Sequence, residues 1–367
     1  MSDRKEMLPG YYKDQLTSEQ AKEEVQKLTF YPIMFQGARV LRTTGILNEV
    51  YKNKRPGISA QDVAEKLKLP YYGVNTLLEV GLTIGLFYLK KNDTYSLTKM
   101  GYFLLKDEAT RVNLNFTHDV CYKAVFHLEE AIKKELPAGL KEIDQTGNDT
   151  IYPGLSQLQE QVKTSWFDFD HYYSDKAFPT ALKVVFGDSP KHIIDIGGNT
   201  GKWSIACCHF NSEVKMTIVD LPGQWNRAKK NIEKRNLQDR IFGIVGDVLS
   251  DTLKLPESAD AVWMSQFLDC FSEQQIVDIL KNISREIDED TSVYILETFW
   301  DRQTDLAAAF CLTGTSLYFT AVANGNSKMY HSRDMYAAIE KAGLEVVSDQ
   351  DGIGEFHTLL KCRKKKS

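Results

Sequence analysis

The segment from His192 to Gly201, HIIDIGGNTG, constrains the fold of this chain more than any other. Its first five residues form an apolar run typical of a buried strand, and Asp195 lies near the end of that run. Gly197, Gly198 and Gly201 then allow a tight turn in which the backbone approaches a ligand closely. In an α/β sheet, such a strand and turn followed by a helix predict a nucleotide-type pocket at the carboxyl end of the strand.

Strands and helices alternate along the sequence from about residue 185 onwards. This alternation predicts a doubly wound α/β domain, and two successive strands at its end predict an antiparallel hairpin. We expect strands at HIIDI, VKMTIVD, IFGIVGD, ADAVWMSQF, TSVYILETF, LEVVSD and EFHTLLKC, and helices at KWSIACCHF, QWNRAKKNIEKRN, SEQQIVDILKNISREI and YAAIEKAGL.

The first third of the chain has the pattern of a winged helix. In GISAQDVAEKLKL, Ser59 is placed to cap a helix, with Asp62 three residues later in a variant of the capping box. Pro70 begins a second helix, YYGVNTLLEVGLTIGL, and FYLKKNDTYSLTKMGYFLL follows as a hairpin with Asn92 and Asp93 at its turn. Two helices and a hairpin in this order predict a winged-helix domain.

A winged helix raises the alternative of DNA binding, in which the second helix would enter the major groove. That helix contains Glu79 but no Lys or Arg, and most of its side chains are apolar. The chain carries a net charge of -5, which gives no electrostatic attraction to phosphate. We therefore expect a protein partner within a dimer and no nucleic acid, and salt-sensitive DNA binding would contradict this expectation.

The length of 367 residues predicts more than one domain. We expect a dimerisation domain at 1–110, linking helices that contribute to a substrate pocket at 111–184, and a ligand-binding domain at 185–367. The polar start and the absence of an apolar run of about 18 residues predict neither a secretory signal nor a membrane span. The six cysteines lack C-x-x-C or zinc spacing, so we expect reduced thiols, no metal site and a cytoplasmic location.

The spacing of the glycines and three aspartates narrows the choice of ligand. The turn reads G-G-N-T-G, so the G-x-G-x-x-G spacing that holds a dinucleotide pyrophosphate is absent, which argues against a nicotinamide dehydrogenase. Asp220 ends the second strand and can accept hydrogen bonds from both ribose hydroxyls, and Asp247 ends the third and can accept from an adenine amino group. Asp195 can order the loop and help to meet an ammonium group. Together these features predict S-adenosylmethionine.

The motifs D-I-G-G-N-T-G, I-V-D-L-P, G-D-V and S-E-Q-Q-I-V-D-I-L-K-N-I resemble those of class I S-adenosylmethionine-dependent methyltransferases. They are most similar to the small-molecule O-methyltransferase family of plant caffeate, hydroxyindole and bacterial antibiotic enzymes. The resemblance spans most of the chain and implies a Rossmann-like sheet of seven strands, a mostly helical winged-helix dimerisation domain and a homodimer. The resemblance and the strand-end pattern together suggest a set of cofactor-binding residues: Asp195, Gly197, Gly198, Gly201, Asp220, Leu221, Asp247 and Val248. The resemblance also implies that Ser265 and Gln266 lie beneath the sulfonium and that Phe271 lies against the adenine. Tyr173, from the aromatic segment, is a further candidate for cofactor binding.

The chain departs from this family at the catalytic base. The family uses a histidine ahead of the L-K-N helix, and counting back from Leu280 places Asp269 at that position. A carboxylate is a weak base for a phenol, although burial can raise its pKa by a few units. Glu297 matches one of the acidic residues that support the base in the family. The position of the family's second supporting acidic residue falls near Met329, which cannot take up a proton. His331, two residues later, is an alternative proton acceptor.

Both candidate bases have a simpler interpretation as helix caps. Asp269 could cap a helix that starts at Ser272, and His331 could cap one that starts at Ser332. The missing histidine also leaves open a cofactor-binding regulatory protein that has lost transfer activity.

Aromatic residues are dense from Ser165 to Phe178 and recur in DLAAAFCLTGTSLYF and YFTAVANGNSK. Aromatic faces suit flat apolar substrates and sulfonium cations, so we expect some of these rings to line a cavity for a small aromatic substrate. We expect methyl transfer to a phenolic oxygen, with transfer to ring carbon as the alternative and nitrogen or sulfur left open. The substrate-pocket candidates are Phe169, Tyr172, Phe310, Tyr318 and Phe319, with His171 beside them.

Overall fold

A computed structural model describes residues 13–250, 252–256 and 259–365 of the chain. Contacts divide the chain into two units, Met1–Thr117 and His118–Ser367. Most of the polar start, from which we expected no signal segment, lies outside the described residues. The finer domain boundaries at residues 110 and 184 stay a prediction.

The first unit is built mainly from helices around its own apolar core. Its predicted helix cap is confirmed, because the Ser59 hydroxyl accepts the Asp62 N–H at 3.1 Å. Leu41, Leu47, Val63 and Leu78 belong to the core of this unit and are fully buried. The elements are α1 (Ser18–Thr43), α2 (Ile46–Lys52), α3 (Ala60–Leu67), α4 (Tyr71–Thr83), β1 (Phe87–Lys90), β2 (Thr94–Leu97), α5 (Lys99–Lys106) and α6 (Glu108–Phe116).

The predicted hairpin is confirmed in its strands and turn but not in its length. Lys90 pairs with Thr94, so the loop is Lys91, Asn92 and Asp93, and the last two have positive φ angles of 71° and 54°. The strands β1 and β2 pair antiparallel. The residues KMGYFLL, which we expected to continue the hairpin, form α5 instead. The physical reason is a helix cap, because the Thr98 hydroxyl accepts the Gly101 N–H at 3.1 Å.

The second unit contains the predicted doubly wound sheet, with seven strands in the order β5-β4-β3-β6-β7-β9-β8. Neighbours from β5 to β7 pair in parallel, and β9 is antiparallel to both β7 and β8. The strand order reverses between β3 and β6, and ligands of such sheets bind at that point, beyond the carboxyl ends of the strands. The strands are β3 (His192–Ile196), β4 (Lys215–Asp220), β5 (Ile241–Val245), β6 (Ala261–Ser265), β7 (Ser292–Glu297), β8 (Leu344–Ile353) and β9 (His357–Lys364).

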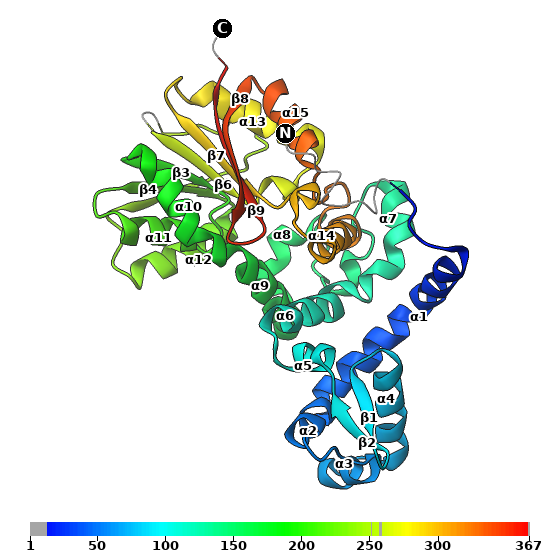
Figure 1. Cartoon of the computed structure of the whole chain (residues 1–367). Helices are drawn as coiled ribbons and strands as arrows, with labels where there is room; N and C mark the ends of the chain where they lie inside the picture. Colours follow the sequence, from blue (N-terminus) through cyan, green and yellow to red (C-terminus); the bar gives the residue numbers. More distant parts are fainter. Residues whose placement is uncertain (1–12, 251, 257–258, 366–367) are drawn as a thin grey trace. The chain divides into compact units, whose positions relative to one another are not determined.

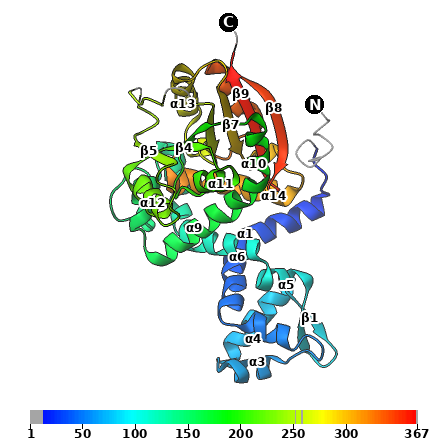
Figure 2. The same cartoon turned by 90° about the vertical axis from the view of Figure 1, so that its left-hand side faces the viewer.

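Helices cover both faces of this sheet, and each face has its own apolar core (Figure 1). One core joins the strands to α13 (Glu273–Glu286) and α15 (Ser332–Lys341). The other joins them to α10 (Phe178–Val185), α11 (Lys202–Phe210) and α12 (Pro222–Glu233), the layer seen from its outer side in Figure 2.

Further helices of the second unit come from the linking region and from the segment after β7. The helix α14 (Leu306–Tyr318) continues into a π-helical turn, Phe319–Ala323, and this turn contacts α7 and α8. The linking region supplies α7 (Leu128–Lys134), α8 (Ile151–Gly154) and α9 (Glu160–Ser174).

The stretch Leu306–Ala323 corrects one expectation from the sequence. It is one helical stretch of 18 residues that is long and apolar enough to cross a membrane by length and composition, where we expected none. A core helix of a globular protein meets the same criterion, and the stretch includes Thr313, Thr315 and Ser316. The finding therefore carries no further conclusion about a membrane.

Candidate cofactor and catalytic site

The glycine turn lies at the carboxyl end of β3, as predicted, and presses against the segment that follows β6. Gly197 has a φ of +70°, and a Cβ atom there would lie 2.2 Å from Phe267 Cδ2. A side chain larger than hydrogen therefore does not fit at this position. Asn199 also adopts a positive φ, 50°, and α11 begins directly after the turn.

Asp195 lies beneath this turn and is only 2% exposed. Its Oδ2 accepts a hydrogen bond from the Ser204 hydroxyl at 2.6 Å, which links β3 to α11. Burial raises the pKa of Asp195 to about 7, with the Ser204 hydrogen bond acting in the opposite direction. The carboxyl group thus orders the loop from inside.

Asp220, at the end of β4, joins two loops at the same edge of the sheet. Its Oδ2 accepts the Asn199 N–H and its Oδ1 accepts the Leu221 N–H, both at 2.7 Å. Burial raises the pKa of Asp220 to about 6, against these two hydrogen bonds. Each carboxylate oxygen still has a second lone pair, so the group can also accept from the hydroxyls of a ribose.

Asp247 follows β5 and is exposed, and its Oδ1 accepts the Leu249 N–H at 2.9 Å. Val248 beside it packs its side chain into the core, so its backbone is the part available to a ligand. Because β3, β4 and β5 are adjacent and parallel, the structure brings Asp195, Asp220 and Asp247 to one edge of the sheet.

The segment after β6 offers polar atoms to a ligand. Gln266 has a positive φ of 46°, and within the described part of the chain the buried Ser265 Oγ and Gln266 Oε1 have no hydrogen-bond partner. Buried polar atoms are rarely left unsatisfied, so a polar ligand is the fitting partner. Phe267 and Phe271 stack edge to face with their ring centroids 5.0 Å apart. These residues and the strand-end aspartates suit S-adenosylmethionine.

Asp269 and Glu297 form a buried pair of carboxyl groups on neighbouring segments. Asp269 lies in a short helical turn, Leu268–Cys270, and is 5% exposed, while Glu297 ends β7 and is 2% exposed. Glu297 Oε1 accepts the N–H groups of Phe267 and Leu268 at 3.0 and 2.8 Å. Burial raises the pKa of Asp269 to about 6 and, with the charge of Asp269, holds the pKa of Glu297 well above its usual range. The charge of Asp269 therefore opposes ionisation of Glu297.

The structure separates the two capping alternatives. Ser272 is the cap of α13, in a capping box with Gln275, so the suggestion that Asp269 caps this helix is wrong. His331 does cap α15, because its Nδ1 accepts the Arg333 N–H at 3.1 Å, and it lies 3.4 Å from Asp301 Oδ2. The Nδ1 atom is thus engaged in the helix cap, so His331 could accept a substrate proton only at Nε2.

Several residues around Asp269 were not predicted. The Cys270 thiol donates to Asp269 Oδ1 at 3.5 Å, and Asn324 Nδ2 donates to the Cys270 carbonyl at 2.6 Å. Burial and the neighbouring Cys270 raise the pKa of Tyr152 well above its usual range. Asn324 lies within YFTAVANGNSK, one of the segments that the sequence singled out, whereas Tyr152 lies outside all of them.

The aromatic residues predicted to line the substrate pocket differ in their burial. Tyr318 and Phe319 are buried, and Tyr318 accepts a hydrogen bond from Trp166 Nε1 at 2.7 Å. Phe169 packs on Tyr173, and Tyr172 accepts from Lys176 Nζ at 2.8 Å. Phe310 is 75% exposed, so it does not line an enclosed cavity of this chain.

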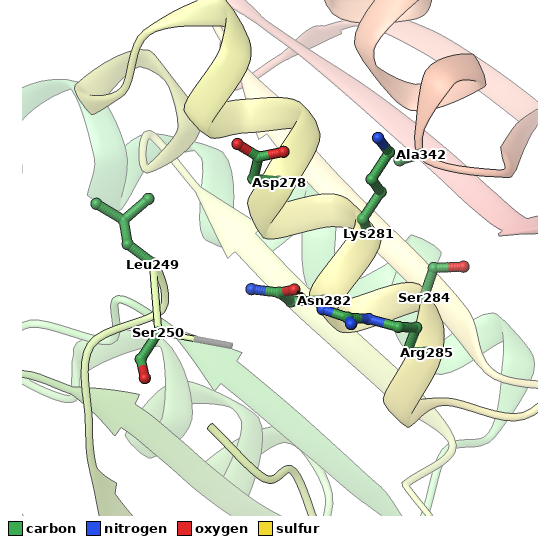
Figure 3. A pocket seen from close by; sticks show the side chains of 8 residues that line it. All are labelled: Leu249, Ser250, Asp278, Lys281, Asn282, Ser284, Arg285 and Ala342. Atoms are coloured by element: carbon green, nitrogen blue, oxygen red, sulfur yellow. Dashed lines mark hydrogen bonds between the residues drawn. The ribbon is translucent and has the colours of Figure 1, made fainter. Parts of the chain in front are cut away.

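An open hollow elsewhere on the second unit contains none of the predicted residues. It lies along α13 and is lined by Asp278, Lys281, Asn282 and Arg285 of that helix and by Leu249 and Ser250 of the loop after β5 (Figure 3). In the described ranges, no three His, Cys, Asp or Glu side chains are grouped as metal ligands.

Two family models match the chain. Residues 180–344 match an O-methyltransferase domain, and residues 22–95 match a Dimerisation2-like domain. The first match contains the strand-end aspartates together with Asp269 and Glu297. The second match contains most of α1, all of α2, α3, α4 and β1, and ends within β2.

Individual proteins agree with these matches. The L-tyrosine C(3)-methyltransferase of Streptomyces lavendulae is 22% identical over 299 residues, which cover 81% of this chain and 80% of that protein. Cephaeline 6'-O-methyltransferase IpeOMT1 of Carapichea ipecacuanha is 27% identical over 210 residues, 55% of each chain. The apo structure of the S-adenosylmethionine-dependent methyltransferase SibL has a TM-score of 0.71 at 20% identity, over 94% of this chain and 99% of that chain, and shows the shared fold.

Proposed function

This chain is an S-adenosylmethionine-dependent methyltransferase with an O-methyltransferase domain, and we propose that it methylates a phenolic oxygen of a small aromatic metabolite. The observation that carries the proposal is the buried Asp269, which by its count from Leu280 stands at the position of the catalytic histidine in the family that this chain resembles. Its neighbour Cys270 is within electrostatic range of the buried Tyr318, whose hydroxyl accepts from Trp166. We further propose Asp220, Leu221, Asp247, Val248, Ser265, Gln266, Phe271 and Tyr173 as cofactor contacts.

Asp269 accepts the proton of the acceptor hydroxyl in this mechanism. The cofactor supplies an electrophilic methyl group on a cationic sulfonium. Glu297 keeps its own proton, fixes the Phe267 and Leu268 backbone and so positions the Asp269 turn. The apolar and aromatic wall excludes water and orients the ring, and such orientation can supply a large share of the rate.

A labelling experiment tests the proposal. The purified protein is incubated with a carbon-13 methyl donor and phenolic acceptors, and the product is examined by NMR. A methoxy resonance supports transfer to oxygen. The absence of turnover with every phenol, together with no binding of the donor, would remove the proposal.

Transfer to ring carbon is the second candidate, and two observations favour it. The relative that aligns with 81% of this chain carries the name L-tyrosine C(3)-methyltransferase, and the usual histidine is replaced by Asp269. A phenolate formed at Asp269 would activate the carbon next to the oxygen. The same experiment separates the two candidates, because L-tyrosine among the acceptors would then give an aryl methyl resonance.

We also propose that the protein is a homodimer that associates through its first unit. The support is the Dimerisation2-like match and a set of exposed apolar side chains on α1, namely Val25, Leu28, Phe30 and Ile33, which are 48% to 67% exposed. We expect sedimentation equilibrium to give twice the chain mass of 41.8 kDa. A monomer at micromolar concentration would contradict this proposal.

The cytoplasmic location and the expectation of no nucleic-acid or membrane partner stay predictions.

A further inference from the structure

Asp170, in the C-terminal part of α9, lies beside the glycine turn although it precedes Asn199 by 29 residues. Asn199 Nδ2 donates to Asp170 Oδ2 at 3.5 Å, and the Asn199 N–H donates to Asp220 Oδ2 at 2.7 Å. Asn199 therefore stands between the carboxylate that we assign to the ribose and a second carboxylate from α9.

The charges around Asp170 leave room for a cationic ligand. Its ion pair with His171 is long, with 3.7 Å between Oδ2 and Nδ1, and Lys202 Nζ pairs at 2.6 Å with Asp175 instead. Burial raises the pKa of Asp170, the charge of His171 lowers it, and the charge of Asp269 raises it further. A carboxylate so placed is stabilised by a cation that approaches to hydrogen-bond distance.

Asp195, the sequence-based candidate for the donor's ammonium group, is poorly placed for that contact. It is 2% exposed and already accepts from the Ser204 hydroxyl. If the ribose binds at Asp220 and the sulfonium faces Asp269, as proposed above, the donor's amino-acid chain would lie near the groups that contact both residues. Asp170 is in contact with the turn held by Asp220 and within electrostatic range of Asp269.

We propose that Asp170 binds the α-ammonium group of the bound methyl donor and that Asn199 holds the carboxylate in position. The inference rests on the proposed function, since it assumes that S-adenosylmethionine binds at this edge of the sheet. Asp195 then acts as a positioning residue, which orders the glycine turn from below.

Calorimetry with two ligands tests the assignment without turnover. S-adenosylhomocysteine is compared with an analogue that lacks only the α-amino group, on the wild type and on Asp170→Asn. The loss of one charged hydrogen bond should weaken S-adenosylhomocysteine binding about tenfold or more. The analogue should bind both proteins equally. Asp175→Asn is the matched control, because it removes a carboxylate that also faces His171, and it should change neither affinity.

The outcomes separate this inference from the proposed function. If the wild type binds S-adenosylhomocysteine and Asp170→Asn binds it equally well, the assignment is overturned while the function stands. If Asp170→Asn weakens both ligands to the same extent, Asp170 only shapes the turn and the assignment is also overturned. If the wild type binds neither ligand, both fail. Asp170→Glu keeps the negative charge, so it should still bind S-adenosylhomocysteine more tightly than the analogue that lacks the α-amino group. This result would show that the loss in Asp170→Asn comes from the missing charge and not from a folding defect.

Discussion

Asp269→Asn should abolish most methyl transfer while leaving cofactor binding intact. The amide has nearly the shape of the carboxyl group, so the 5% exposed site stays packed, but it cannot accept a proton from the substrate. Loss of a positioned general base lowers kcat by about 10²- to 10⁴-fold. Steady-state kinetics with the acceptor found by labelling measure the loss, and calorimetry with S-adenosylhomocysteine measures the cofactor affinity. Asp278→Asn, on the outer side of α13, is the control for removal of a carboxylate.

The pH profile identifies the role of the group. Burial raises the pKa of Asp269 to about 6, and only its ionised form is a base. At saturating methyl donor, so that titration of Asp220 does not limit cofactor binding, the wild-type kcat/KM for the acceptor should therefore be constant above this pH and fall as pH decreases through about 6. The Asp269→Asn variant should lack this acidic limb. An Asp269→Asn enzyme within twofold of the wild-type kcat would show that orientation alone carries the reaction.

The cofactor edge was predictable from the sequence because it depends on local patterns. Asp195 and Asp220 lie at the ends of the apolar strands β3 and β4, and Asp247 lies just beyond β5. Parallel strands bring their carboxyl ends to one edge of the sheet. The hairpin turn at Asn92 and Asp93 was predictable for a similar reason, since these residue types tolerate positive φ.

The substrate side was only partly predictable because it depends on packing between distant segments. Trp166 and Tyr318 meet across 152 residues of sequence, and no periodicity encodes that contact. Asp170 was hidden among aromatic neighbours whose helical spacing indicates a core. The sequence could not decide whether His331 caps α15 or accepts a proton, and only the hydrogen bond from the Arg333 N–H to His331 Nδ1 showed the cap. The sequence thus identified the methyl donor more readily than the groups that surround the acceptor.

Gly197→Ala should destroy the cofactor site and destabilise the second unit. Alanine at a φ of +70° is strained, and its Cβ would lie 2.2 and 2.6 Å from Phe267 Cδ2 and Cε2. Glu297 holds the Phe267 N–H, so a backbone shift would disturb the segment that carries Gln266 and Asp269, and the Phe267 ring packs against Phe271. We expect the free energy of unfolding to fall by about 2–4 kcal/mol from strain and overpacking. Affinity for S-adenosylhomocysteine should fall by about 100-fold or more, since each 1.4 kcal/mol is tenfold.

Gly343→Ala separates backbone strain from the collision. Gly343 has a φ of +78°, and among the described residues no atom lies within 4 Å of the position of its Cβ. This variant should lose only about 1–3 kcal/mol of stability, the cost of a left-handed non-glycine residue, and should bind S-adenosylhomocysteine like the wild type. Denaturant unfolding and calorimetry on both variants measure the two effects. Equal cofactor affinity in Gly197→Ala and the wild type would mean that the ligand does not lie against the glycine turn, and the assignment of this edge of the sheet to the methyl donor would then be wrong.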